Sequence, residues 1–172
     1  TTGEIIEVLT ARDVIRAIGE AAHACGDPGV QYDTTINRWH TCPRSGRINA
    51  SNPCSEYMFV DNSACNLASV NLMKFSGDQH AFDVRRFQHV VRLLIIAQDI
   101  LVDNGSYPTA EIAENSHRFR PLGLGYANLG ALIMSLGKPY DSDEGRAFAG
   151  AITALLTSYA YTASAEIAAT RG

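Results

Sequence analysis

Apolar residues recur at helical spacing near the start of the chain. Between residues 11 and 25 they form one stripe, made of Val14, Ile15, Ile18, Ala22 and Cys25. Thr10 precedes this stripe as a candidate N-cap with Asp13 three residues later, and Gly26 follows it as a helix-ending residue. The pattern predicts a helix over residues 11–25, with Cys25 as a buried structural cysteine on its apolar face.

Longer elements follow in the second half of the chain. Asp83 can cap a helix that runs to about Asp103 and is closed by Gly105, with a broad apolar face. A helix over residues 126–136 and an Ala-rich helix over residues 144–170, capped by Ser142, come after it. Residues 63–72 are typical of a buried strand and residues 118–124 of a short one. Strands separated by helices predict an α/β architecture.

The Ala-rich stretch also has to be weighed as a membrane span, because residues 147–165 contain no charged side chain. Its composition argues against a span, since it holds only two Leu and one Ile among many small residues. Small side chains are typical of a closely packed core helix. We therefore expect no membrane segment. The first residues, Thr1 to Glu4, are not a basic region followed by an apolar stretch, so a signal peptide is not expected either.

Composition and charge narrow the function classes. The 172 residues are 46% hydrophobic and 19% charged, which fits a folded chain of one domain's size. The net charge of −4 offers no basic excess for nucleic acid. The four cysteines include no Cys-x-x-Cys pair, so a zinc site is not expected. The glycines at 123, 125 and 130 lack a dinucleotide-binding spacing, and we interpret them as close packing between a strand and the following helix.

The candidate chemistry lies in residues 52–56, with the sequence NPCSE. Pro53 disfavours helical geometry at the preceding residue, so we expect an extended chain here. In an extended chain Asn52, Cys54 and Glu56 project to one face, which brings an amide, a thiol and a carboxylate together. Such a set offers hydrogen bonding, redox chemistry and a proton acceptor. From spacing alone, a polar turn with an incidental buried cysteine explains the residues equally well.

The motif NPCSE, together with SACNLASVNL at residues 63–72, closely resembles the large chain of ribonucleotide reductases. GDPG at 26–29 and RPLGLGY at 120–126 extend the resemblance over nearly the whole chain. The NPCSE form is most similar to the cobalamin-dependent class II branch, and class I is the close competitor. The resemblance implies a segment of the ten-stranded α/β barrel, with residues 1–172 as a central and incomplete part of that domain.

The resemblance also implies roles for four residues. Cys54, on a finger loop inside the barrel, would carry the thiyl radical that abstracts the 3′-hydrogen of the ribonucleotide. Glu56 would take the proton of the 3′-hydroxyl, and Asn52 would hydrogen-bond the ribose hydroxyls. Cys65 would be one half of the dithiol that is oxidised to a disulfide in each turnover. Neither Cys25 nor Cys42 matches the family position of its partner, and Cys42 is expected to be a partly exposed loop cysteine.

The implied enzyme is an oxidoreductase of the ribonucleoside-diphosphate reductase type, acting on a ribonucleoside di- or triphosphate. Adenosylcobalamin is the implied cofactor and thioredoxin or glutaredoxin the implied reductant. Neither nucleic acid nor a membrane is an expected partner, the full-length enzyme is a candidate homodimer, and its location is expected to be cytoplasmic. The alternatives are a class I large-subunit segment or a non-catalytic structural fragment. Part of the apolar content is expected to be surface that other segments of the barrel cover.

Overall fold

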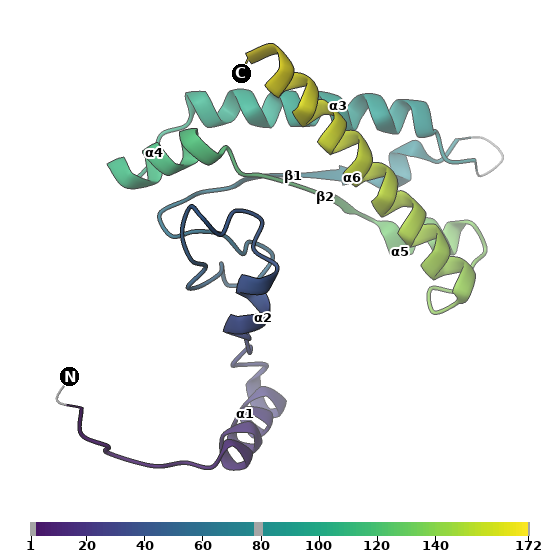
Figure 1. Ribbon diagram of the computed structural model, residues 1–172. Coiled ribbons are helices and arrows are strands. Elements are labelled where there is room, and N and C mark those ends of the chain that lie inside the picture. The colour runs from purple at the N-terminus through teal and green to yellow at the C-terminus, as the bar shows by residue number, and fades with distance from the viewer. Residues whose placement is uncertain (1–2, 78–80, 172) are drawn as a thin grey trace. The chain divides into compact units, whose positions relative to one another are not determined.

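The computed structural model describes residues 3–77 and 81–171, which divide into two compact units, residues 1–61 and 62–172 (Figure 1). The first unit contains helices α1 (Ala11–Cys25) and α2 (Asp33–Arg38). The second unit contains two strands, β1 (Asn66–Asn71) and β2 (Leu122–Ala127). Its helices are the 3-10 helix η1 (Leu72–Phe75), α3 (Val84–Asn104), α4 (Ala110–Phe119), α5 (Leu129–Ser135) and α6 (Asp143–Arg171). Strands separated by helices confirm the predicted α/β class.

Helix α1 has the predicted bounds. The Thr10 hydroxyl accepts a hydrogen bond from the Asp13 N–H, and Gly26 adopts the left-handed conformation that ends the helix. The prediction of a buried Cys25 is wrong, because no residue of α1 is buried and Cys25 is exposed. Val14 and Ile15 of the same apolar stripe are also exposed, and Ile18 and Ala22 are half-buried. An amphipathic pattern shows that a face can be buried, but it does not supply the surface that buries it.

The core of the first unit lies beside α2 and is small. Its buried apolar side chains are Ile48 and Val60. Asn37, on α2, holds the backbone of Ile48 in a reciprocal pair. The Asn37 amide nitrogen donates to the Ile48 carbonyl and its amide oxygen accepts from the Ile48 N–H, each at 3.0 Å. One amide side chain therefore fixes the chain that leads to the NPCSE motif.

The second unit is built on two parallel strands, paired from Asn66 with Leu122 to Asn71 with Ala127. Parallel strands need a crossover connection, which α3 and α4 provide between them in sequence. Figure 1 shows α3 and α6 on one side of the strand pair. Side chains of the strands, η1 and the helices form one core, made of Val70, Leu72, Phe75, Phe87, Val91, Leu132, Ile152 and Leu156.

The start of β2 is tied to α3 by the guanidinium of Arg120. Its Nε donates to Asp99 and its Nη1 to Asp103, both at 2.7 Å, while its Nη2 donates to the Asp99 carbonyl. These hydrogen bonds raise the pKa of Arg120 above its ordinary value, with the bond to Asp103 as the largest cause. Arg120 itself adopts a left-handed backbone conformation at the end of α4. The cluster therefore sets where β2 begins.

The predicted helices over 83–103 and 144–170 are confirmed, with Asp83 and Ser142 accepting hydrogen bonds from N–H groups of the first turns. The strand predicted over 63–72 is shorter, and among its residues 66–71 only Val70 is buried. The strand predicted over 118–124 is shifted, and β2 extends to Ala127, so the helix expected from residue 126 starts later. Helix α4 was not predicted, because its mostly polar residues bury one side chain, Ser116.

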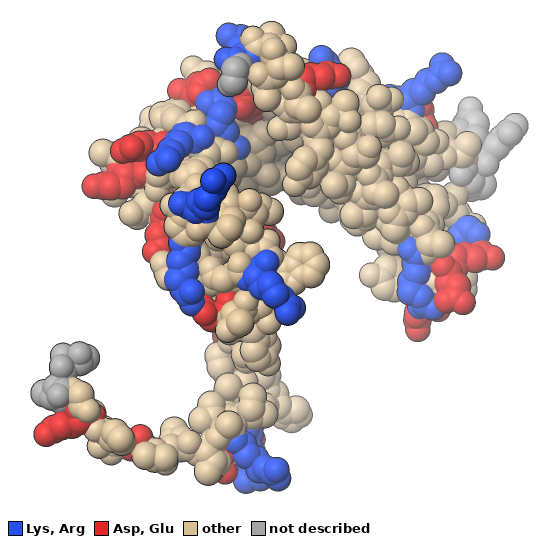
Figure 2. Space-filling view, in the orientation of Figure 1, with Lys and Arg blue, Asp and Glu red and all other residues tan. Residues whose placement is uncertain are grey.

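Helix α6 carries the long uncharged stretch, and Figure 2 shows a broad surface of uncharged residues over it. Charged residues gather near its start, where Lys138 pairs with Glu144 and Arg146 with Asp141 and Asp143. The Lys138 hydrogen bond lowers the pKa of Glu144. Within residues 3–77 and 81–171, every helix is too short or too polar to cross a membrane.

Candidate active site

The NPCSE motif forms a tight turn in the first unit. The Ser55 N–H donates to the Asn52 carbonyl at 3.0 Å, which places Pro53 and Cys54 at the centre of a four-residue turn. Proline is favoured at the first central position because its ring fixes the φ angle that the turn requires. Ser55 then has a φ of 65°, in the left-handed region. The extended chain predicted for residues 52–56 is therefore wrong.

The turn sits in a loop whose two ends are joined. Ser51 and Met58 form an antiparallel bridge, and the Tyr57 N–H donates to the Asn52 amide oxygen at 3.0 Å. The Gln31 amide nitrogen donates to the hydroxyl oxygens of both Ser51 and Ser55. Each bond uses a donor or acceptor of the loop itself. The loop that carries Cys54 is thus braced from within the first unit.

The three candidate side chains on this loop differ in how they are held. Asn52 is half-buried, and its amide oxygen is engaged by the loop backbone, which leaves its amide nitrogen as the group to donate outward. Cys54 and Glu56 are exposed, and within the described ranges neither side chain takes part in a hydrogen bond. An accessible thiol and an accessible carboxylate therefore stand on a turn with a fixed backbone.

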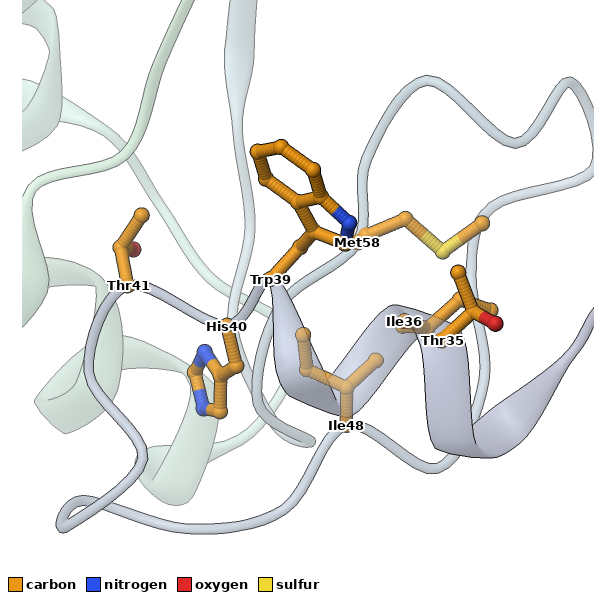
Figure 3. Close-up of a pocket in the computed structure, with 7 residues that line it drawn as sticks. All are labelled: Thr35, Ile36, Trp39, His40, Thr41, Ile48 and Met58. Atoms are coloured by element: carbon orange, nitrogen blue, oxygen red, sulfur yellow. The ribbon is translucent and has the colours of Figure 1, made fainter.

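A pocket of about 280 Å³ lies beside α2 in the same unit (Figure 3). It is lined by Thr35, Ile36, Trp39, His40, Thr41, Ile48 and Met58. Met58 belongs to the bridge that closes the Cys54 loop. The His40 Nδ1 lies 3.4 Å from the Cys42 backbone nitrogen, and its Nε2 lies 3.0 Å from the Gly46 carbonyl oxygen. Both ring nitrogens of His40 are therefore engaged by the backbone of its own loop. Cys42 is half-buried in a loop, as predicted.

Cys65 lies in the second unit, immediately before β1. Its S–H donates to the carbonyl of Asn66 at 3.6 Å. A Cβ atom added at Gly123 would stand 3.1 Å from the Cys65 sulfur and 2.2 Å from Leu67 Cδ2. The absence of a Cβ at Gly123 therefore leaves room for the neighbouring strand and for the cysteine. The prediction that it packs against the following helix is wrong.

Gln98 is a buried polar residue that the sequence analysis missed. It lies on α3, with an exposed fraction of 2%, and its amide nitrogen donates to the carbonyls of Asn66 at 3.1 Å and Gly123 at 2.8 Å. A signal for it exists in the sequence. Gln98 shares a helical row with the buried Val91, Ile95 and Val102, so it is a polar residue at a core position.

The four predicted site residues fall in different units: Asn52, Cys54 and Glu56 belong to the first and Cys65 to the second. None of the four cysteines of the chain forms a disulfide in the structure. In the part of the chain that the structure describes, no group of three or more His, Cys, Asp and Glu residues is arranged to hold a metal ion.

Comparisons with known proteins cover the whole chain. The family described as "Ribonucleotide reductase, barrel domain" matches residues 2–172. Proteins named vitamin B12-dependent ribonucleotide reductase are similar to it, from Streptomyces clavuligerus (59% identity over 99% of the chain) and Rhodopirellula baltica (61% over 94%). A vitamin B12-dependent ribonucleoside-diphosphate reductase of Mycobacterium tuberculosis is 37% identical over 99% of the chain. The chain spans 18%, 16% and 25% of these three proteins.

Proposed function

Because this chain belongs to the ribonucleotide reductase barrel-domain family, we propose that the full-length protein reduces ribonucleotides to deoxyribonucleotides, with Cys54 as the thiol that carries the radical. The observation that supports this most is the braced turn, which presents an exposed Cys54 between Asn52 and Glu56. We further propose that residues 1–172 are a central segment of the catalytic barrel and that the turn is its finger loop.

In this proposal the Cys54 sulfur radical takes the hydrogen atom from C3′ of the ribose, so that an S–H bond forms and the C3′–H bond breaks. Glu56 accepts the proton of the 3′-hydroxyl, which favours loss of the 2′-hydroxyl as water. Asn52 donates its amide N–H to a ribose hydroxyl oxygen, since its amide oxygen is engaged by the Tyr57 N–H. A fixed turn supports this chemistry because it holds the three groups in register with the sugar.

Two further thiols supply the reducing equivalents. Cys65 and a second cysteine lose two electrons and two protons as they form a disulfide, and the substrate becomes a deoxyribonucleotide plus water. We place the second cysteine outside this chain, because neither Cys25 nor Cys42 matches its family position. Thioredoxin or glutaredoxin then reduces the disulfide by thiol–disulfide exchange. A transient disulfide of this kind is typical of a cytoplasmic enzyme.

The proposal includes adenosylcobalamin as the cofactor, as the names of the relatives indicate. When bound, this cofactor supplies the one-electron chemistry that starts the radical reaction. Three pockets in the described part of the chain have volumes of about 280, 240 and 80 Å³. These volumes are below the usual range for a drug-sized ligand, and a corrinoid is larger than such a ligand. We assign no residue of the described ranges to the cofactor.

The experiment that tests the proposal replaces Cys54 by Ser in the full-length protein. Cys54→Ser should abolish deoxynucleotide formation from both di- and triphosphate substrates in the presence of adenosylcobalamin and a dithiol. Cys42→Ser is the matched control, because Cys42 is a loop cysteine of the same unit, and it should keep activity within about twofold. Deoxynucleotide production by Cys54→Ser at the wild-type rate would overturn the assignment.

A further inference from the structure

We propose that Gln98 is a positioning residue for Cys65, because its amide holds the Asn66 carbonyl that accepts the Cys65 S–H and the carbonyl of Gly123, the residue whose missing Cβ leaves room for the sulfur. The inference concerns the geometry and reactivity of the Cys65 thiol. It rests on the proposed function for its catalytic meaning, since Cys65 is a reducing thiol only in that proposal. The reactivity of the Cys65 thiol can be measured without turnover. The positioning role of Gln98 and the proposed function can therefore be disproved independently of each other.

Gln98 occupies a core position in the fold. It lies on the buried row of α3 that includes Val91, Ile95 and Val102, with only 2% of its surface exposed. Both protons of its amide nitrogen are used, one on the Asn66 carbonyl of β1 and one on the Gly123 carbonyl of β2. A single side chain of α3 therefore spans the starts of both strands.

The two residues whose carbonyls Gln98 holds, Asn66 and Gly123, also lie next to the Cys65 sulfur. The Asn66 carbonyl that accepts from Gln98 also accepts the Cys65 S–H. The Gly123 residue held by the other bond is the one whose missing Cβ makes room for the sulfur, with 3.1 Å between the two positions. Gln98 thus holds the carbonyls of two residues, Asn66 and Gly123, that both approach the Cys65 sulfur.

Burying the amide of Gln98 costs free energy. Burial of a polar group is unfavourable unless its hydrogen bonds are made. Within the described residues, the Gln98 Oε1 and the Asn66 Oδ1 are buried without a hydrogen-bond partner. Methionine would fill nearly the same volume without this penalty, but it could not hold two carbonyls. The two donated bonds are therefore what the amide contributes at this position.

The loss of these bonds has a defined effect on the thiol. A carbonyl released by Gln98 becomes a better acceptor for the Cys65 S–H, and a stronger S–H hydrogen bond favours the thiol over the thiolate. The thiolate is the form that reacts with alkylating agents and disulfides. Gln98→Met in the full-length enzyme should therefore slow alkylation of Cys65 by iodoacetamide about threefold at pH 8.

Gln98→Glu adds a second measurement, the pH dependence of Cys65 alkylation, which a purely structural role of Gln98 would not change. A protonated glutamic acid keeps one donor, whereas a carboxylate has none. The Cys65 alkylation rate of Gln98→Glu, divided by the wild-type rate at the same pH, should rise toward one as the pH falls from 9 to 6. The ratio for Gln98→Met should not change with pH. The change of the Gln98→Glu ratio with pH does not depend on Gln98→Met, so it remains decisive if Gln98→Met does not fold.

Asn66→Ala is the matched control. It removes the bond from the Asn66 amide nitrogen to the Gln98 backbone carbonyl, 3.1 Å long, and leaves both bonds donated by Gln98 in place. Its Cys65 alkylation rate should stay within about 1.5-fold of wild type. A Gln98→Glu ratio that stays near one and flat across the whole pH range would overturn the inference. Wild-type multiple turnover by Cys65→Ser would instead overturn the reducing role of Cys65 and leave the alkylation result standing.

Discussion

Glycine at position 123 is the residue on which the environment of Cys65 most directly depends. Gly123→Ala would place a Cβ 2.2 Å from Leu67 Cδ2 and 3.1 Å from the Cys65 sulfur. The exposed Leu67 side chain can move away, whereas the sulfur of the half-buried Cys65 would have to shift by a few tenths of an ångström. We expect a loss of about 1 kcal/mol in the free energy of unfolding, measured by urea titration.

Gly125→Ala serves as the control for this prediction. It lies in the same strand, but the nearest atom to its added Cβ would be the Ser69 hydroxyl oxygen at 3.9 Å. Its free energy of unfolding should equal that of wild type within about 0.5 kcal/mol. Equal losses for the two substitutions would show that the contact with Cys65 and Leu67 does not matter.

The reducing role of Cys65 is tested by Cys65→Ser in the full-length enzyme. A serine hydroxyl cannot form the disulfide, so turnover sustained by thioredoxin should cease while radical initiation from the cofactor continues. Steady-state kinetics with thioredoxin and an assay of cofactor homolysis separate the two effects. Cys25→Ser should behave as wild type in both assays, because Cys25 is exposed on α1. Unchanged steady-state turnover by Cys65→Ser would show that Cys65 is not one of the two reducing thiols.

At the level of elements, helix ends were the most predictable feature. The bounds of α1 and α3 follow from Thr10, Asp83 and the terminal glycines, because capping is a local interaction between neighbouring residues. The site was less predictable. Pro53 was interpreted as favouring an extended chain, whereas its fixed φ suits the first central position of a turn equally well.

Contacts between distant segments could not be predicted from local patterns. Gln98 and Gly123 meet only because α3 packs on the two strands, and no local spacing encodes that contact. The lack of buried residues on α1 has the same origin, because the apolar pattern of a helix does not specify the surface against which the helix packs. The roles of Asn52, Cys54, Glu56 and Cys65 came from the family motif and remain predictions.

The Arg120 cluster makes the attachment of β2 to α3 dependent on pH. The hydrogen bond from Arg120 holds the pKa of Asp103 below its ordinary value of 3.8. A carboxylate with a lowered pKa stabilises the fold above its unfolded-state value, and this contribution is lost as the pH falls below about 4. Asp103→Asn should therefore be less stable than wild type at pH 7, and the difference should vanish toward pH 2.

The measurement for this prediction is urea unfolding of both proteins between pH 2 and 7. Because Asp103 is largely exposed, the difference at pH 7 should be small and should shrink further in high salt. A difference between Asp103→Asn and wild type that grows as the pH falls would contradict the assigned ion pair.

At the scale of the whole molecule, the two units differ in their buried apolar content. The first has Ile48 and Val60, whereas the second has the core around Phe87 together with further buried residues of α3, α5 and α6. Residues 62–172 expressed alone should therefore show a cooperative thermal transition by circular dichroism. Residues 1–61 expressed alone should show none. A cooperative transition of the short piece would show that its core is sufficient.

The expectation that part of the apolar content lies at the surface is confirmed. Large apolar side chains are exposed in both units, among them Ile6, Trp39, Leu67, Leu101 and Tyr161. The chain spans less than a fifth of the first relatives, so their remaining segments offer ample length to cover such surfaces. That they do so remains a prediction.

The pairing of Asn66 with Leu122 has a consequence for the synthesis of the protein. A ribosome adds about 5 to 20 residues per second, so β2 emerges roughly 3 to 11 seconds after β1. Throughout that interval the Cys65 thiol lacks Gly123, and for the first part of it the chain also lacks Gln98. The nascent chain therefore presents this cysteine to cellular oxidants before its final environment exists, and translation speed over α3 and α4 determines for how long.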